Sequence, residues 1–147
     1  MSLPPNPSLV LGQRPLRVLH RESRVPANTR RLGPYQIEDL ITASEEGAGT
    51  VYRVEIPADT TTGASVHRLA EEFYYVLSGK GTVVVDGLAQ SVSAGHFLRL
   101  PPGAVHQFKT TDEALEMLNI HTPGCRPDRD TYFVSEAPEG FGPGQGP

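Results

Sequence analysis

Short apolar runs alternate with polar breaks along most of the chain, from Tyr35 to Pro123. The runs are rich in Val, Ile, Tyr, Phe and Thr, and Gly, Pro or Asp separates nearly all of them. Such residues favour strands, and turn residues at this spacing are typical of an all-β sandwich or barrel. We therefore predict a β-barrel of two antiparallel sheets with little helix. The expected strands are, in order, YQIEDLIT, TVYRVEIP, SVHRL, EFYYVLSG, GTVVVDG, QSVSAG, HFLRLPPG, HQFKT and LEMLNIHTPG.

Three parts of the chain differ in composition. Residues 1–34 form an arm rich in Pro and Arg, in which the apolar stretch Leu16–His20 could add an edge strand. Residues 35–134 are expected to form the barrel, with a hairpin turn at Asp86-Gly87, a pair that type I′ turns prefer. Residues 135–147 have the composition of a flexible tail.

Length and composition bound the class of protein. The 147 residues suit one domain with one core. No apolar run approaches the roughly 20 residues of a membrane span, and the first residues lack the pattern of a signal peptide. A single cysteine excludes an internal disulfide, and the net charge of −4 argues against nucleic acid as a partner. These features predict a cytoplasmic protein that binds neither nucleic acid nor membrane.

Charge is distributed unevenly. Residues 1–34 carry six arginines and one glutamate, a net charge of +5, whereas the remaining chain has a net charge of −9. The arm is therefore expected to dock on the acidic body of its own chain or of a partner subunit, covering an open strand edge in a homodimer. Binding of an anionic ligand or polymer is the alternative.

Candidate chemistry gathers around one histidine and one glutamate. If the chain bends near Ala70–Glu71, the side chains of His67 and Glu72 both point into the barrel, because residues two apart in a strand share a face. A buried carboxylate is costly unless it is paired or bound to metal, and imidazole is a suitable second ligand. The turn at residues 101–103 returns the chain so that His106 opens the next strand at the barrel mouth.

The stretch SVHRLAEEFYYVLSG resembles the first motif of the cupin superfamily. That motif has a His-x-His pair, a glutamate shortly after the second histidine, and a glycine beyond it. Glu72 and Gly79 are separated by the motif's seven residues, which makes Glu72 the motif glutamate. His67 falls at the second histidine, and Ser65 stands where the first histidine usually stands.

The stretch GHFLRLPPGAVHQFKT matches the second cupin motif through Gly95, Pro101, Gly103 and His106, while Thr110 replaces the closing asparagine. The two motifs agree in order and spacing, and together they span half of the chain. The resemblance implies the cupin fold, a double-stranded β-helix or jelly-roll barrel, and small-molecule binding.

The resemblance also implies a metal site. His67, Glu72 and His106 make up the two-histidine, one-carboxylate set that holds non-haem iron with open coordination positions. The implied ion is divalent, and Fe, Mn, Ni, Co and Zn all fit. Two interpretations stay open. In one the ion binds and Ser65 leaves room for a water or a substrate atom; in the other the missing histidine marks a metal-free binding pocket.

Two aromatic residues are expected to line the pocket. Tyr74 shares the face of Glu72, and Phe108 lies two residues beyond His106, so both should point inward. Tyr74 is a catalytic candidate, and a core aromatic with a bonded hydroxyl is an equally good account of it.

The last expected strand has two possible phases. If Asn119 and His121 face inward, both line the pocket, and His121 supplies a fourth ligand or a general base. If Leu118 and Ile120 face inward instead, the strand has the more ordinary core pattern.

Two arginines and the cysteine carry smaller expectations. Arg53 and Arg99 could each bind a substrate carboxylate, but their apolar neighbours are the expected inward set, so both are predicted to be exposed. Cys125 is expected to lie beyond the barrel, without a basic partner that would make it reactive.

Three functions are compatible with this site. The first is a small metal-dependent enzyme acting on a small organic metabolite, either a dioxygenase or an isomerase, cyclase or lyase. The second is a non-catalytic binding module for a sugar or small metabolite, with a degenerate metal site. The third is a role in dimerisation with a vestigial pocket. The three ligand residues favour the enzyme, although the fold alone does not fix the function.

Overall fold

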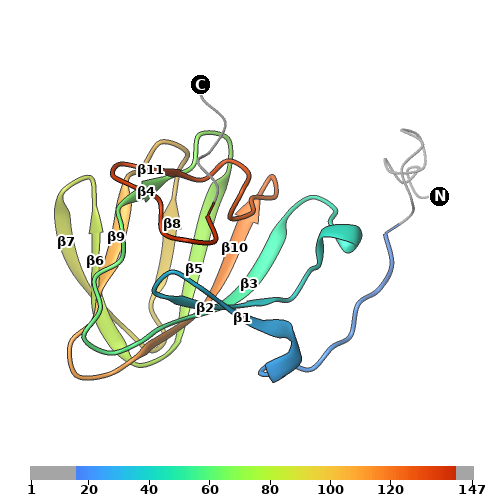
Figure 1. Ribbon diagram of the computed structural model, residues 1–147, viewed down its shortest axis with the longest axis horizontal. Coiled ribbons are helices and arrows are strands. Elements are labelled where there is room, and N and C mark those ends of the chain that lie inside the picture. Colours follow the sequence, from blue (N-terminus) through green and yellow to red (C-terminus); the bar gives the residue numbers. More distant parts are fainter. Residues whose placement is uncertain (1–15, 142–147) are drawn as a thin grey trace, which may run out of the picture.

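The computed structural model describes residues 16–141, which form two antiparallel sheets facing each other (Figure 1). The strand order is β1-β2-β3-β10-β5-β8 in one sheet and β11-β4-β9-β6-β7 in the other. The elements are η1 (Pro26–Asn28), β1 (Thr29–Leu32), β2 (Tyr35–Asp39), η2 (Ala43–Glu45), β3 (Thr50–Ile56), β4 (Ser65–Val66), β5 (Glu71–Ser78), β6 (Lys80–Val85), β7 (Leu88–Ser93), β8 (Phe97–Leu100), β9 (His106–Lys109), β10 (Leu115–Thr122) and β11 (Tyr132–Phe133).

The predicted all-β barrel is confirmed, and each expected run overlaps one of the strands β2 to β10. The core lies between the sheets, where alternate residues of each strand point inward. Val54 on β3 lies opposite Met117 on β10, and Ile56 lies opposite Leu115; all four are buried. Burial of each such side chain contributes about 1.5–3 kcal/mol before the entropy cost of ordering it.

The hairpin predicted at Asp86-Gly87 joins β6 to β7. Both residues have left-handed φ angles, 48° and 85°, as a type I′ turn requires. Asp86 also exchanges two hydrogen bonds with Val105: its N–H donates to the carbonyl of Val105, and its Oδ1 accepts from the N–H of Val105. The turn thereby fixes the residue that precedes His106.

The arm contributes an edge strand, but not at the stretch that the sequence indicated. Leu16–His20 has no strand structure, and Val18 is 97% exposed. Instead Thr29–Leu32 forms β1, which pairs with β2 through a tight turn at Gly33. A strand next to its partner in sequence closes a short loop, whereas Leu16–His20 would have to reach a distant edge. Residues 1–15 lie outside the described part.

Ion pairs hold the described part of the arm on acidic residues of the same chain, which is the first of the alternatives expected from its charge. The arm follows the side of the barrel formed by β1, β2 and β3 (Figure 1). The pairs are Arg21–Glu45, Arg24–Glu116 and Arg30–Asp39.

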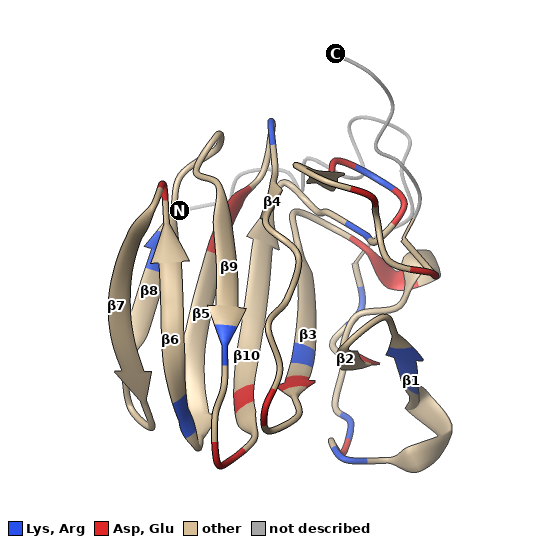
Figure 2. Cartoon of the chain, turned by 60° about the vertical axis from the view of Figure 1, so that its left-hand side comes forward, with Lys and Arg blue, Asp and Glu red and all other residues tan. Residues whose placement is uncertain are grey.

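Arg53 is buried, which corrects the prediction that it is exposed. Its Nε lies 3.1 Å from Oε1 of Glu38, and its Nη1 lies 3.1 Å from Oε2 of Glu116. The arm covers this surface, because the backbone N–H groups of Arg24 and Val25 also donate to the carboxylate of Glu38. Figure 2 shows the basic and acidic stretches of β3 and β10 at the same end of the sheet.

After β10 the chain returns across the open end of the barrel (Figure 1). There β11 pairs with β4, with Tyr132 opposite Val66 and Phe133 opposite Ser65. Residues 135–141, assigned to the flexible tail from their composition, follow β11, and Phe141 packs against the core cluster. No helix within residues 16–141 has the length and apolar character that crossing a membrane requires.

Candidate metal centre

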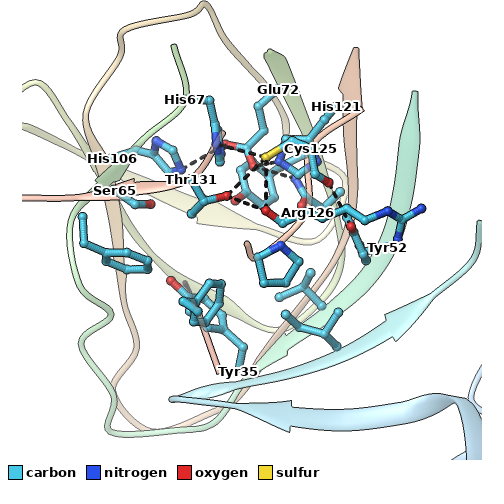
Figure 3. Close-up of a pocket in the computed structure, with 17 residues that line it drawn as sticks. Tyr35, Tyr52, Ser65, His67, Glu72, His106, His121, Cys125, Arg126 and Thr131 are labelled. Atoms are coloured by element: carbon cyan, nitrogen blue, oxygen red, sulfur yellow. Dashed lines mark hydrogen bonds and ion pairs between the residues drawn. The ribbon is translucent and has the colours of Figure 1, made fainter. Parts of the chain in front are cut away.

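Three imidazoles surround one buried carboxylate inside the barrel (Figure 3). Oε1 of Glu72, on β5, lies 2.9 Å from Nε2 of His106 and 3.3 Å from Nε2 of His67. Oε2 of Glu72 lies 2.6 Å from Nε2 of His121. His67 follows β4, His106 begins β9 and His121 lies near the end of β10. Both sheets therefore aim Nε2 atoms at the same carboxylate.

The second ring nitrogen of two histidines is held by the backbone. Nδ1 of His67 lies 2.8 Å from the carbonyl oxygen of Asp130, and Nδ1 of His106 lies 3.1 Å from that of Ala104. Because a carbonyl oxygen only accepts, each Nδ1 carries a proton, and Nε2 of a neutral ring presents a lone pair. Outer hydrogen bonds of this kind orient metal-binding histidines in proteins.

His121 is oriented by a hydroxyl group. Its Nδ1 lies 3.4 Å from Oγ1 of Thr50. That hydroxyl donates to the carbonyl of Cys125 and accepts from the N–H of Cys125, so its proton is committed and it can accept from His121. The hydroxyl of Tyr52 donates to the same carbonyl at 2.9 Å. All three histidines thus favour the tautomer that is protonated at Nδ1, in which the lone pair of Nε2 faces Glu72.

Oε1 of Glu72 has an unusual environment. It is buried and, among the described residues, no hydrogen bond is directed at it, whereas Oε2 accepts one from Nδ2 of Asn119 at 3.0 Å. Nε2 of His67 and of His106 are its close neighbours. Lone pairs that face a carboxylate oxygen repel it unless a proton or a cation lies between them. A divalent cation fits this set of imidazole nitrogens and carboxylate oxygen.

The electrostatics of the cluster keep Glu72 ionised. Burial opposes the charge, but the neighbouring histidines, His106 first, hold the pKa of Glu72 well below its usual range. Burial also favours a neutral His67, yet its contacts with Cys125 and Glu72 raise the pKa of His67 to about 11. A proton on the imidazole can therefore balance the carboxylate, and a bound cation would take over that role.

The other expected pocket residues lie at different depths. Ser65 is buried, lines the cavity and pairs in register with His106. Tyr74 also lines it, and burial together with the charge of Glu72 raises the pKa of its phenol well above the usual value. Phe108 lies in the core, packed edge-on against Tyr74 with 5.0 Å between ring centroids, and is not among the lining residues.

Strand β10 presents Asn119 and His121 to the barrel interior. Both are buried, whereas Leu118 and Ile120 are partly exposed. The alternative in which Leu118 and Ile120 face the core is therefore wrong. The register places His121 directly opposite Glu72 on β5. Each polar group thereby gains a partner, which offsets the cost of burying it.

Cys125 is part of the site, contrary to the sequence prediction. Its Sγ is buried and lies 3.3 Å from Nδ1 of His67. The contact depends on the return of the chain after β10, which no local pattern reveals. Arg99, by contrast, is exposed as predicted. Ligand atoms lie within 4.8 Å of one another in two overlapping sets, His67–Glu72–His106 and His67–His121–Cys125.

A cavity of about 70 Å³ connects this cluster with the end of the barrel (Figure 3). Its inner part is polar and its outer part is mainly apolar and aromatic. The lining residues are Tyr35, Ile37, Tyr52, Val54, Ser65, His67, Glu72, Tyr74, His106, Asn119, His121, Cys125, Arg126, Pro127, Thr131, Phe133 and Phe141.

The fold and the site together define the class of protein: small antiparallel β-barrels that hold a cluster of histidines and a carboxylate inside their open end. A family model described as Cupin domain matches residues 52–121. The chain belongs to the cupin superfamily, as its two motifs indicated.

Several solved structures share this fold. A Cupin 2 conserved barrel domain protein from Salinispora arenicola is 21% identical with a TM-score of 0.63, covering 72% of this chain and 90% of that chain. PAC13 from Streptomyces, in a structure with uridine, is 16% identical with a TM-score of 0.63, covering 81% and 94%. A sugar phosphate isomerase of the cupin superfamily from Silicibacter pomeroyi is 21% identical with a TM-score of 0.58, covering 70% and 67%. At these identities the likeness shows the fold alone. No curated protein sequence matches the chain.

Proposed function

We propose that the protein is a small metal-dependent cupin enzyme that acts on a small organic molecule. The observation that carries the proposal is Oε1 of Glu72, a buried carboxylate oxygen without a directed hydrogen bond, next to Nε2 of His67 and His106. His121 adds a third imidazole. These four residues would hold one divalent ion, and Fe, Mn, Ni, Co and Zn all suit such ligands.

When bound, the ion supplies Lewis-acid polarisation of a substrate oxygen and a template for orienting the substrate. The chain's own residues do the rest. Tyr74 keeps its phenolic proton at neutral pH, because burial and Glu72 raise its pKa, so it can donate a hydrogen bond to a substrate oxygen. Ser65 is small enough to leave room beside His106. The segment after β10 contributes six residues to the cavity lining and would limit the entry of water; they are Cys125, Arg126, Pro127, Thr131, Phe133 and Phe141. These roles suit a dioxygenase or an isomerase, cyclase or lyase.

One observation favours a second candidate, a non-catalytic module that binds a sugar or another small metabolite. Nε2 of His121 lies only 2.6 Å from Oε2 of Glu72, so these two side chains contact each other directly and leave no space for an ion between them. The cluster would then serve as a polar floor that hydrogen-bonds a metabolite.

Metal analysis separates the two candidates. Wild type, His106→Ala and His96→Ala are purified and dialysed in parallel, and metal content is measured by plasma mass spectrometry. His96 is exposed in the turn before β8 and serves as the matched control. The enzyme proposal expects stoichiometric metal in wild type and His96→Ala and its loss in His106→Ala. Equal metal content in wild type and His106→Ala, or none in wild type after incubation with each ion, would remove the proposal.

We also propose that the protein works as a homodimer in the cytoplasm. Three large apolar side chains, Tyr75, Leu77 and Phe97, are exposed on the outer face of the six-stranded sheet. Exposed apolar patches of this kind often mark protein contacts. Cys125 is a free thiol, as expected in a reducing compartment. Sedimentation of wild type and Tyr75→Glu tests the dimer, which the charged variant should weaken.

A further inference from the structure

The ring of Phe141 lies at the mouth of the cavity between two other aromatic rings. Its centroid is 5.7 Å from that of Tyr35, at an interplanar angle of 67°, and 5.2 Å from that of Phe133, at 68°. Both contacts are edge-to-face, the arrangement that aromatic rings prefer. All three residues line the cavity that ends at Glu72. The chain therefore places one of its own aromatic rings at the entrance to the candidate site.

Within the described part of the chain, packing contacts hold the segment that carries Phe141 on the barrel. Pro138 lies against Gly33 so closely that a Cβ there would come within 2.6 Å of it, and Gly140 approaches Leu32 in the same way. The N–H of Phe141 donates to the carbonyl of Pro138 within the segment. Within residues 16–141, no hydrogen bond joins residues 135–141 to the barrel. Segments without such bonds open at low free-energy cost.

The cavity mouth offers apolar walls rather than a free charge. The partly exposed rings of Tyr35, Phe133 and Phe141 line it, and the buried Ile37 and Val54 line the cavity further inside. Arg126 also lines the cavity, but its guanidinium group already has partners in the same chain. Its Nε lies 2.9 Å from Oε1 of Glu46, and its Nη2 donates to the carbonyl of Ile41. The mouth is thus suited to a flat apolar group, with polar atoms of the same molecule directed toward the histidines.

We propose that Phe141 occupies a subsite for a planar aromatic ring, and that the ligand of this protein displaces it on entry. The ligand class is a small molecule that carries an aromatic ring at one end and polar atoms at the other. The inference rests on the proposed small-molecule site and adds the chemistry of the molecule. Tyr35 and Phe133 would contact the aromatic ring of the ligand, and the side chain of Phe141 competes with that ring for the same subsite.

Indole and p-cresol are the probes. The chain has no tryptophan, so indole fluorescence is observed without background. In wild type the side chain of Phe141 competes with indole. If it occupies the subsite about nine-tenths of the time, its removal in Phe141→Ala tightens indole binding about tenfold. Adding Tyr35→Ala to Phe141→Ala should abolish the gain, because the remaining wall is lost. Leu88→Ala removes an exposed apolar side chain on β7, away from the cavity, and should leave indole affinity unchanged.

A second variant reports displacement directly. In Phe141→Trp the new ring should emit as a partly buried indole, and saturating p-cresol should shift that emission toward the wavelength of a fully exposed indole. Leu88→Trp, on the exposed side of β7, should not respond. An unchanged indole affinity in Phe141→Ala, or an unshifted Phe141→Trp spectrum, overturns the proposal. Both measurements are made on metal-loaded and chelator-treated protein. If the ring is displaced but the protein binds no metal in the dialysis experiment, the enzyme proposal is rejected and the subsite stands. If the protein binds metal but the ring is not displaced, the subsite is rejected and the enzyme proposal stands.

Discussion

The backbone carbonyl of Asp130 accepts a hydrogen bond of 2.8 Å from Nδ1 of His67. The same residue clamps the loop between His67 and Glu72, because its carboxylate accepts hydrogen bonds from the backbone N–H groups of Arg68, Leu69 and Ala70 at 2.8–3.2 Å. Its φ of 58° is left-handed. Asp130 thus links the segment that crosses the barrel mouth to the candidate metal centre.

Asp130→Gly should lower metal affinity by about tenfold, the lower end of the effect of losing a group that orients metal ligands, because the loop between His67 and Glu72 is no longer held. Glycine accepts the left-handed backbone and keeps the carbonyl, so this variant removes only the carboxylate clamp. Competition with a chromophoric chelator measures the affinity. Asp128→Asn, an exposed neighbour, is the control and should bind like wild type. If Asp130→Gly also binds like wild type, the clamp does not position His67.

His121 stands in for the missing motif histidine in this proposal. His121→Ser should therefore lower metal affinity by at least about tenfold. Ser65 is buried, lines the same cavity and lies opposite His106 in the sheet, so Ser65→His in the His121→Ser background should restore binding. Metal titration of wild type, the single variants and the double variant is the measurement. Unaltered affinity in His121→Ser would show that β10 supplies no ligand.

The stability of the protein should fall in acid partly through Glu38. Burial raises its pKa, but the N–H groups of Arg24 and Val25 and the guanidinium of Arg53 outweigh that and lower the pKa below the ordinary 4.5. A carboxylate with a lowered folded-state pKa stabilises the fold above its unfolded-state pKa, and this stability is lost as pH falls through the folded value. Glu38→Gln should therefore flatten the decrease in stability below about pH 4.5.

The same variant has an effect at neutral pH. Arg53 keeps its contact with Glu116 but loses its buried partner, so Glu38→Gln should reduce the free energy of unfolding by about 3 kcal/mol. Urea unfolding at several pH values measures both effects. Asp112→Asn removes an exposed carboxylate 4.0 Å from Lys80 and is expected to leave stability unchanged. A parallel pH profile for wild type and Glu38→Gln would contradict the assignment.

Gly79 and Gly87 have nearly the same left-handed φ, 82° and 85°, in different surroundings. A Cβ on Gly79 would come within 1.9 Å of the carbonyl oxygen of Ala114, whereas a Cβ on Gly87 would meet nothing within 4 Å. Gly87→Ala should cost about 1 kcal/mol from the backbone alone. Gly79→Ala should cost about 3 kcal/mol or more, since the backbone must also shift. Denaturant midpoints of the two variants test this, and equal midpoints would contradict it.

The sequence by itself determined the features that depend on neighbours along the chain. Alternation in the runs from β2 to β10 marks strands because side chains two apart share a face, and Asp86-Gly87 marks a hairpin because both residues tolerate left-handed angles. The motif spacing singled out His67, Glu72 and His106, which the fold brings together at one carboxylate.

Only the tertiary structure decided the features that depend on distant segments. β10 could bury either of its faces, and its register beside β5 selected His121 because Glu72 lies opposite. Arg53 is buried because the arm and Glu38 cover it, although its strand pattern favours exposure. Cys125 and Asp130 reach His67 because the chain returns over the barrel mouth. Such contacts are set by packing and hydrogen bonding between segments that no local sequence pattern encodes.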